Sequence, residues 1–229
     1  MNNLRKTRFL QEDYFVCARE NMVLKHLIPF GVTNPNLLKS FFNIPREIFL
    51  EEGHQETAYS DIFKGGNLRG SMLPPHFLGR LLQEAPLDGQ GKALVIGGGS
   101  GYSAALLSGV MSLVFLLENH KNLVKRANEL MDHLGIDNVF AVEGALDQGL
   151  PQQGSFDVIL IEGAVEEIPV PILQQIAYDG VLLTFLSKNP FMKEAVSLKK
   201  TKSGWVEKSL FDGNIPVLQA FSKYKNFDF

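Results

Sequence analysis

Three alternating glycines and one acid have the spacing in this sequence that most directly suggests chemistry. Gly97, Gly99 and Gly101 follow the apolar run "KALVI", and Glu118 ends a second apolar run, "SLVFLLE". A glycine turn lets the backbone approach a ligand closely, and an acid about 20 residues further on can accept hydrogen bonds from ribose hydroxyls. The pattern predicts a site for a nucleoside-bearing ligand. The alternative is that the glycines only tighten a turn and that Glu118 is a solvated strand end.

The stretch from Ala93 to Glu118 must position these residues, and it is almost entirely uncharged. A membrane span needs about 20 predominantly apolar residues, so its length alone would suffice. The glycine run in its middle forms helices poorly, however. We therefore interpret the stretch as a buried strand, a tight turn, a helix and a second strand. The helix that begins near Gly101 would offer free N–H groups to an anionic part of the ligand.

Strands and helices alternate from Lys92 onward, and the helix over 120–135 is amphipathic and stopped by Gly135. Apolar strands in repeated strand–helix units imply an α/β fold with a doubly wound, mostly parallel sheet that is covered on both faces. We expect strands at 92–97, 112–118, 138–144, 156–163 and 181–187, and helices at 102–109, 120–135 and 169–180.

The N-terminal third and the C-terminal tail follow other patterns. Helical spacing is present in 16–28, 34–42 and 76–84, and the second of these begins with a candidate N-cap, Asn34, followed by proline. The stretch between Glu51 and Met72 is rich in loop residues. The tail over 204–222 predicts two further strands around a turn at Asp212-Gly213.

Composition excludes several classes of partner and site. The 229 residues carry a formal net charge of −3, and the basic residues are scattered, so we expect no nucleic-acid or membrane partner. Cys17 is the only cysteine, which rules out a disulfide framework and favours a reducing, cytoplasmic location. The histidines lack metal-ligand spacing, so we expect no metal site.

The residue after the glycine turn discriminates between nucleoside cofactors. The dinucleotide fingerprint requires a third glycine at position 102, which is Tyr102 here, and this disfavours a nicotinamide-dependent oxidoreductase. The spacing Gly-x-Gly-x-Gly is instead similar to that of S-adenosylmethionine-dependent methyltransferases with a Rossmann-like fold.

Longer stretches resemble one family, the protein-L-isoaspartate O-methyltransferases, and especially a diverged bacterial branch. The similarity runs in order from about Ala18 to Thr184. The N-terminal element "IPRE-F" makes it specific, because that element is not general to methyltransferases. The stretches that carry it are "NMVLKHLIPFGVTNPNLLKSFFNIPREIFL", "AYSDI", "MLPPHFLGRLL", "VIGGGSGYSAALLS", "FLLENHKNLVKRA" and "FDVILIEGAVEEIP".

The resemblance implies a protein-repair activity that uses S-adenosylmethionine. The family methylates the free carboxyl of isoaspartyl residues in protein or peptide substrates, and the ester then collapses to a succinimide. Because a carboxylate is already ionised at neutral pH, no strong general base is needed, and alignment of the reacting atoms would dominate catalysis. It also implies a division into an N-terminal helical extension with the active-loop region, 1–75, and a methyltransferase-like core, 76–229. The oligomeric state is left open.

The resemblance carries family site positions onto this chain. Ser71, His76 and Glu162 are candidates for the catalytic region, although none is assigned a catalytic role. The expected cofactor-binding residues are Gly97, Gly99, Ser100, Gly101, Glu118, Asn119, Ala145 and Leu146.

Four positions depart from the family pattern. Val95 replaces an acid before the glycine turn, Ala145 replaces an aspartate near the adenine, and Leu73 stands at an active-loop serine. Glu162 ends the fourth strand, where the family has a small or hydroxyl residue. It could attract the cofactor's sulfonium and repel an anionic acceptor, or it could pair with a nearby cation. Two alternatives therefore remain: a relative with another methyl acceptor, and a non-catalytic protein that kept the fold.

Overall fold

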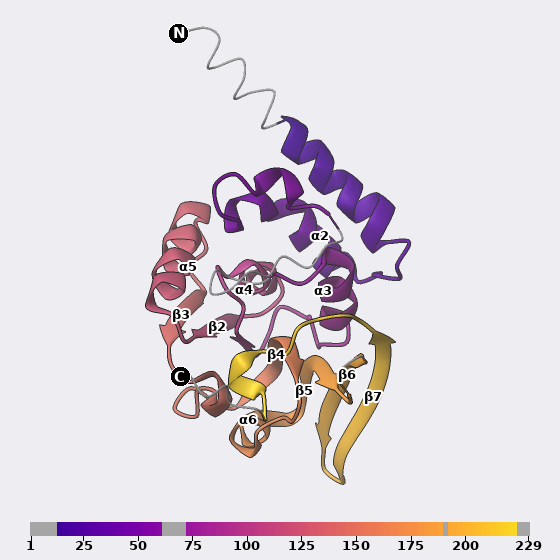
Figure 1. Cartoon of the computed structure of the whole chain (residues 1–229), viewed down its shortest axis with the longest axis vertical. Coiled ribbons are helices and arrows are strands. Elements are labelled where there is room, and N and C mark those ends of the chain that lie inside the picture. Colours follow the sequence, from indigo (N-terminus) through magenta and orange to yellow (C-terminus); the bar gives the residue numbers. More distant parts are fainter. Residues whose placement is uncertain (1–12, 61–71, 190–191, 224–229) are drawn as a thin grey trace, which may run out of the picture.

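A seven-stranded sheet forms the centre of the computed structural model, which describes residues 13–60, 72–189 and 192–223 (Figure 1). The strand order is β3-β2-β1-β4-β5-β6-β7; the first five strands run parallel, and β6 and β7 are antiparallel additions. The strands are β1 (Lys92–Ile96), β2 (Leu113–Glu118), β3 (Val139–Glu143), β4 (Phe156–Val165), β5 (Ile176–Ser187), β6 (Lys193–Thr201) and β7 (Gly204–Asp212).

The central strands are apolar along their whole length because both of their faces are buried. In β1, Ala93 and Val95 belong to one hydrophobic cluster, whereas Leu94 and Ile96 belong to the other. Side chains alternate between the two faces of a strand, so each face requires its own apolar set. This explains why the expected strands of the parallel core were readable as continuous hydrophobic runs.

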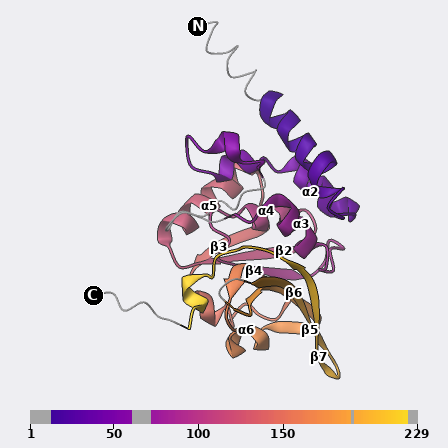
Figure 2. The same ribbon diagram turned by 45° about the vertical axis from the view of Figure 1, so that its right-hand side comes forward.

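Helices cover the two faces, and Figure 2 shows α3, α4 and α5 on one side of the strands and α6 on the other. Asn34 caps the first turn of α2 by accepting from the N–H groups of Asn36 and Leu37, and Gly135 ends α5 at φ 66°. Residues 13–21 are also helical and continue into the π-helical turn Met22–Leu27. The other helices are α2 (Pro35–Asn43), α3 (Pro75–Leu82), α4 (Tyr102–Ser108), α5 (Lys121–Leu134) and α6 (Val170–Gln174).

The order of the strands reverses beside β1, which pairs with β2 on one side and with β4 on the other. In open parallel sheets of this kind, ligands bind outside the carboxyl ends of the strands at the point of reversal. The turn that follows Ile96 therefore lies at the favoured place for a ligand.

Two expected elements differ from the structure. The helix expected over 169–180 is only the short α6, because β5 already begins at Ile176. In the tail hairpin expected around Asp212-Gly213, the first strand is confirmed as β7, but its hairpin partner is β6 and not the segment after Gly213. Three lysines and one glutamate interrupt the apolar residues of β6, and every side chain of β7 is at least partly exposed. Neither strand therefore has the apolar run of a buried strand.

Across the three described ranges, no helix has the length and apolar character that crossing a membrane requires.

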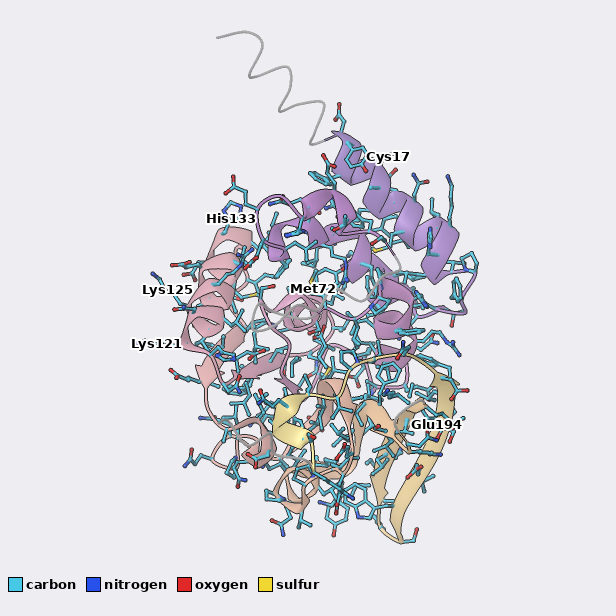
Figure 3. All side chains as sticks on the ribbon, in the orientation of Figure 1. Cys17, Met72, Lys121, Lys125, His133 and Glu194 are labelled. Atoms are coloured by element: carbon cyan, nitrogen blue, oxygen red, sulfur yellow. The ribbon has the colours of Figure 1, made fainter. Side chains whose placement is uncertain are left out.

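The helix α5 is amphipathic and lies on the surface. Figure 3 shows Lys121 and Lys125 on its outer side, directed away from the body of the molecule.

Candidate cofactor site

The glycine turn after β1 has a backbone conformation that residues with side chains rarely adopt. Gly97, Gly99 and Gly101 have φ angles of 71°, 60° and 96°, in the left-handed region that favours glycine. At Gly101 an added Cβ would lie 3.0 Å from Met131 Cε, so this glycine also allows α4 and α5 to pack closely. The sequence alternation thus reflects both backbone conformation and packing.

Glu118, at the end of β2, turns its carboxylate onto this glycine turn. The Gly99 N–H donates to Glu118 Oε1 at 2.6 Å, and the Asn119 N–H donates to Oε2 at 3.3 Å. The side chain is only 4% exposed, and this burial raises the pKa of Glu118 to about 7, although the two backbone donors act in the opposite direction. The turn and the acid that the sequence analysis coupled are therefore in direct contact.

The carboxylate of Glu118 retains hydrogen-bonding capacity. A carboxylate offers about four lone-pair sites, and the donors of Gly99 and Asn119 account for two of them. The remaining sites suit a pair of neighbouring hydroxyl donors, such as those of a ribose. The arrangement is thus chemically suited to hold a nucleoside.

Apolar side chains adjoin the other side of the turn. A Cβ built on Gly97 would meet Leu218 at 3.2 Å and Leu146 at 3.8 Å. Leu146 is buried, whereas the neighbouring Ala145 is exposed. The two leucines offer a surface on which the flat face of a purine could pack.

Ser100 has a different contact from the rest of the turn. Its hydroxyl is buried and donates to the carbonyl of Phe49 at 2.6 Å. Arg126 of α5 reaches the same segment, where its Nη2 donates to the carbonyls of Ile48 and Leu50. These contacts attach the N-terminal segment to the elements around the glycine turn.

Glu162 lies within β4 and is fully buried. It accepts a hydrogen bond from the hydroxyl of Ser103, and the Leu73 N–H donates to Oε1 at 3.4 Å. Burial raises the pKa of Glu162 to about 7; the hydrogen bonds from Ser103 and Leu73 and the positive charge of Arg46 oppose that increase. The alternatives expected for this residue included pairing with a nearby cation. Arg46 acts on Glu162 electrostatically, but the hydrogen bonds of the two side chains go to other groups.

Arg46 is the site-adjacent residue that sequence reasoning missed. It is fully buried, and its Nε and Nη2 donate to the carbonyls of Ala58 and Leu73 at 2.7 and 2.8 Å. Its guanidinium carbon lies 4.7 Å from the ring centre of Tyr102, the first residue of α4. Burial lowers the pKa of Arg46 from its usual value. The available signal was a single arginine inside the apolar run "IPREIFL".

The structure describes only one of the other two catalytic-region candidates. His76 lies on α3 with its ring 4.7 Å from that of Phe30 and 4.3 Å from that of Phe77. Ser71 falls outside the described residues. Within 13–60, 72–189 and 192–223, no group of three or more acids, histidines and cysteines could hold a metal ion.

Comparison with known proteins identifies the family. The model of "Protein-L-isoaspartate(D-aspartate) O-methyltransferase (PCMT)" matches residues 18–212. A protein-L-isoaspartate O-methyltransferase of Synechococcus sp. (strain JA-2-3B'a(2-13)) is 31% identical over 87% of this chain and 84% of its own length. One from Syntrophobacter fumaroxidans (strain DSM 10017 / MPOB) is 34% identical over 74% of this chain and 79% of its own.

Solved structures agree with this assignment. A protein-L-isoaspartate O-methyltransferase superposes with a TM-score of 0.77 and 27% identity, over 87% of this chain and 65% of that chain. A Plasmodium falciparum chain described as this enzyme in complex with S-adenosyl-L-homocysteine has a TM-score of 0.70 and 20% identity, over 93% and 99% of the two chains, and shows the shared fold. Both the expected Rossmann-like methyltransferase fold and the family resemblance are confirmed. The chain belongs to the protein-L-isoaspartate O-methyltransferase family, whose cofactor is S-adenosylmethionine.

Proposed function

We propose that this chain transfers a methyl group from S-adenosylmethionine to the free carboxyl of isoaspartyl residues in protein or peptide substrates. The observation that carries the proposal is the contact between Glu118 and the Gly99 N–H at the carboxyl edge of the sheet, 2.6 Å long. It brings a ribose-type acceptor to a glycine turn at the point where ligands bind in sheets of this kind. Family membership supports the identity of the cofactor and of the acceptor.

The proposed cofactor contacts divide between two parts of the ligand. Glu118 would accept from the ribose hydroxyls, while Leu146 and Leu218 would exclude water from one face of the purine. The backbone of the turn and the start of α4 would approach the amino-acid end. The complete proposed set is Gly97, Gly99, Ser100, Gly101, Glu118, Asn119, Ala145 and Leu146, with Ser100 acting through its backbone because its hydroxyl is bound to Phe49.

The reaction requires alignment rather than proton transfer. When bound, the cofactor supplies a methyl group to a carboxylate oxygen; the methyl–sulfur bond breaks as the ester bond forms, and the opposite charges of carboxylate and sulfonium cancel. No proton moves, so the chain needs no general base. Ser71 and His76 remain proposals for the acceptor side, together with a functional division into an extension, 1–75, and a core, 76–229.

A second candidate is a protein of this family with another acceptor or without turnover. Leu73, at the family's serine position, is fully buried and has no hydroxyl to offer an acceptor. Methyl transfer from labelled S-adenosylmethionine to an isoaspartyl peptide, with the matching aspartyl peptide as control, decides between the candidates. Selective labelling of the isoaspartyl peptide supports the main proposal. Binding of S-adenosylhomocysteine without such labelling favours another acceptor, and absence of both favours a non-catalytic protein.

We further propose a cytoplasmic location and an interaction with proteins or peptides rather than with nucleic acid or membrane. The single cysteine, Cys17, is free and exposed, which suits a reducing compartment. The net charge of −3 does not favour polyanionic partners.

A further inference from the structure

Both backbone polar groups of one loop residue, Leu73, are held by buried charged side chains. The Leu73 N–H donates to Glu162 Oε1 at 3.4 Å, and the Leu73 carbonyl accepts from Arg46 Nη2 at 2.8 Å. The positive end of one backbone dipole thus faces the carboxylate, and the negative end of the other faces the guanidinium. Leu73 and its neighbour Met72 are fully buried, and Figure 3 shows Met72 near the middle of the molecule.

The carboxylate end of this arrangement adjoins the glycine turn. Glu162 follows Ile161, which pairs with Ile96 at the end of β1. A Cβ built on Gly98 would lie 3.2 Å from Glu162 Oε2, and the same carboxylate binds Ser103 of α4. Glu162 therefore contacts the turn, the helix that follows it, and the loop at Leu73.

The guanidinium end reaches the same helix from the N-terminal segment. Arg46 packs over the ring of Tyr102 and donates to the carbonyl of Ala58 as well as to that of Leu73. Like Glu162, it has no solvent exposure. Charges removed from water are costly unless their hydrogen bonds are made well. Apolar residues could fill the same space, and the hydrogen bonds to Leu73 are what these two side chains add.

The strands on the two sides of the reversal point, β2 and β4, indicate which part of the ligand lies near Leu73. Most of the proposed nucleoside contacts come from the turn after β1, from the end of β2 and from the segment after β3, and Leu218 packs beside Gly163 of β4. Glu162 also belongs to β4, where it is the residue before Gly163. The reacting end of a ligand that lies over β1 and β2 would extend toward β4. The loop at Leu73 would then border the acceptor side.

We propose that Glu162 and Arg46 clamp the backbone of Leu73 against the glycine turn and act as positioning residues for the methyl acceptor. This inference rests on the proposed function. The clamp acts through the loop backbone, so the acceptor-side geometry depends on Glu162 although that side chain has no exposure to a substrate.

Two substitutions of Glu162 separate the effect of its hydrogen bonds from the effect of its charge. Glu162→Gln retains an oxygen for the Leu73 N–H and an amide that can bond the Ser103 hydroxyl, so the clamp should survive. Glu162→Ala removes both bonds. The readouts are hydrogen exchange at the Leu73 amide, the affinity for S-adenosylhomocysteine, and kcat and KM for an isoaspartyl peptide.

We expect Glu162→Ala to accelerate exchange at the Leu73 amide and to lower kcat by about 10-fold or more, since one hydrogen bond is worth about a factor of ten. The affinity for S-adenosylhomocysteine should change by less than about 3-fold, because the proposed cofactor contacts are elsewhere. Glu162→Gln should keep the exchange rate at the Leu73 amide close to that of the unsubstituted protein, because its amide oxygen can still accept from the Leu73 N–H. Unchanged exchange in Glu162→Ala would disprove the clamp, and faster exchange with unchanged kcat and KM would disprove its positioning role.

A second pair of variants covers the case in which Glu162→Ala does not fold. Ser103→Ala removes only the hydroxyl that holds Glu162, whereas Ser108→Ala removes a hydroxyl on the same helix that donates to the Ala105 carbonyl. Faster exchange at Leu73 in Ser103→Ala alone supports the clamp, and equal exchange in both variants refutes it. If the unsubstituted protein transfers no methyl group, the proposed function fails while the exchange experiment still decides the clamp.

Discussion

Replacing Glu118 by glutamine tests the nucleoside site with the smallest change of shape. In the unsubstituted protein the Gly99 N–H donates to a carboxylate oxygen of Glu118 at 2.6 Å, and the glutamine of Glu118→Gln keeps one oxygen that can accept this hydrogen bond. It removes the negative charge and one of the two acceptor oxygens. We therefore expect the turn to keep its conformation while the ligand loses affinity.

The size of the loss follows from the hydrogen bonds involved. Hydrogen bonds to a charged group contribute about 1.5–3 kcal/mol each, against about 0.5–1.5 kcal/mol for neutral ones. Losing one charged bond to a ribose hydroxyl, or weakening two, corresponds to an affinity for S-adenosylhomocysteine about 10- to 100-fold lower.

The same site should make binding depend on pH. The pKa of Glu118 is raised to about 7 by burial, so below that pH the free protein carries a proton that a ribose-binding carboxylate must release. The affinity of the unsubstituted protein should be flat above pH 7 and fall by up to about tenfold per unit below it. Glu118→Gln should lack this slope.

The assay is isothermal titration calorimetry with S-adenosylhomocysteine at pH 6, 7 and 8, with chemical denaturation of both proteins to confirm that they fold. Equal affinity of Glu118→Gln and the unsubstituted protein at pH 8 would refute the assignment of Glu118. The same pH slope in both proteins would refute the linkage to its ionisation.

Two other predictions concern the turn and the buried acid. Gly99→Val, at φ 60°, should abolish measurable S-adenosylhomocysteine binding. The control is Gly135→Val, at a similar φ of 66° with open space around it, which should lower stability without changing the affinity. Calorimetry measures the affinity of both variants, and thermal unfolding measures their stability. For Glu162 the folded-state pKa is raised from 4.5 to about 7, so the folded state binds its proton more tightly and stability is lost as pH rises through that window. Urea denaturation at pH 5 and 8 should show a loss of at most about 3 kcal/mol from this group, absent in Glu162→Gln; an unaltered slope in the variant would contradict this.

The parallel core was predictable because each of its strands can be recognised from a short stretch of apolar residues. Strands β1, β2 and β4 are buried on both faces, and such strands appear in the sequence as uninterrupted apolar runs. The edge strand β3 keeps an apolar sequence although Phe140 is exposed. The glycine turn and Glu118 were predictable for a related reason. Their spacing along the chain follows from one strand–helix–strand unit, and adjacent parallel strands bring their carboxyl ends together.

The outer hairpin was not predictable in the same way. Strand β6 begins with Lys193 and ends in "KKT", and β7 exposes Trp205 and Val206. Strand β6 lies between β5 and β7 and buries only Ala195, Val196 and Ser197, so its sequence has no long apolar run. The edge strand β7 was expected as a strand, but with another partner. Asp212-Gly213 consequently looked like the stronger turn signal.

The contacts around Leu73 could not be derived from spacing. Arg46 and Glu162 are separated from Leu73 by 27 and 89 positions, and their roles appear only when three distant segments pack together. The sequence analysis expected Glu162 to face a ligand or to pair with a cation, and it made no prediction for Arg46. Instead, each binds a different backbone group of the same residue.

The most direct test of the central claim is a calorimetric titration of the unsubstituted chain with S-adenosylhomocysteine at pH 8, with a nicotinamide dinucleotide as the control ligand. If the glycine turn and Glu118 together hold one nucleoside, S-adenosylhomocysteine should bind saturably at a single site in the micromolar range, and the dinucleotide should not bind. Heats indistinguishable from dilution for S-adenosylhomocysteine, or tighter binding of the dinucleotide, would contradict the account.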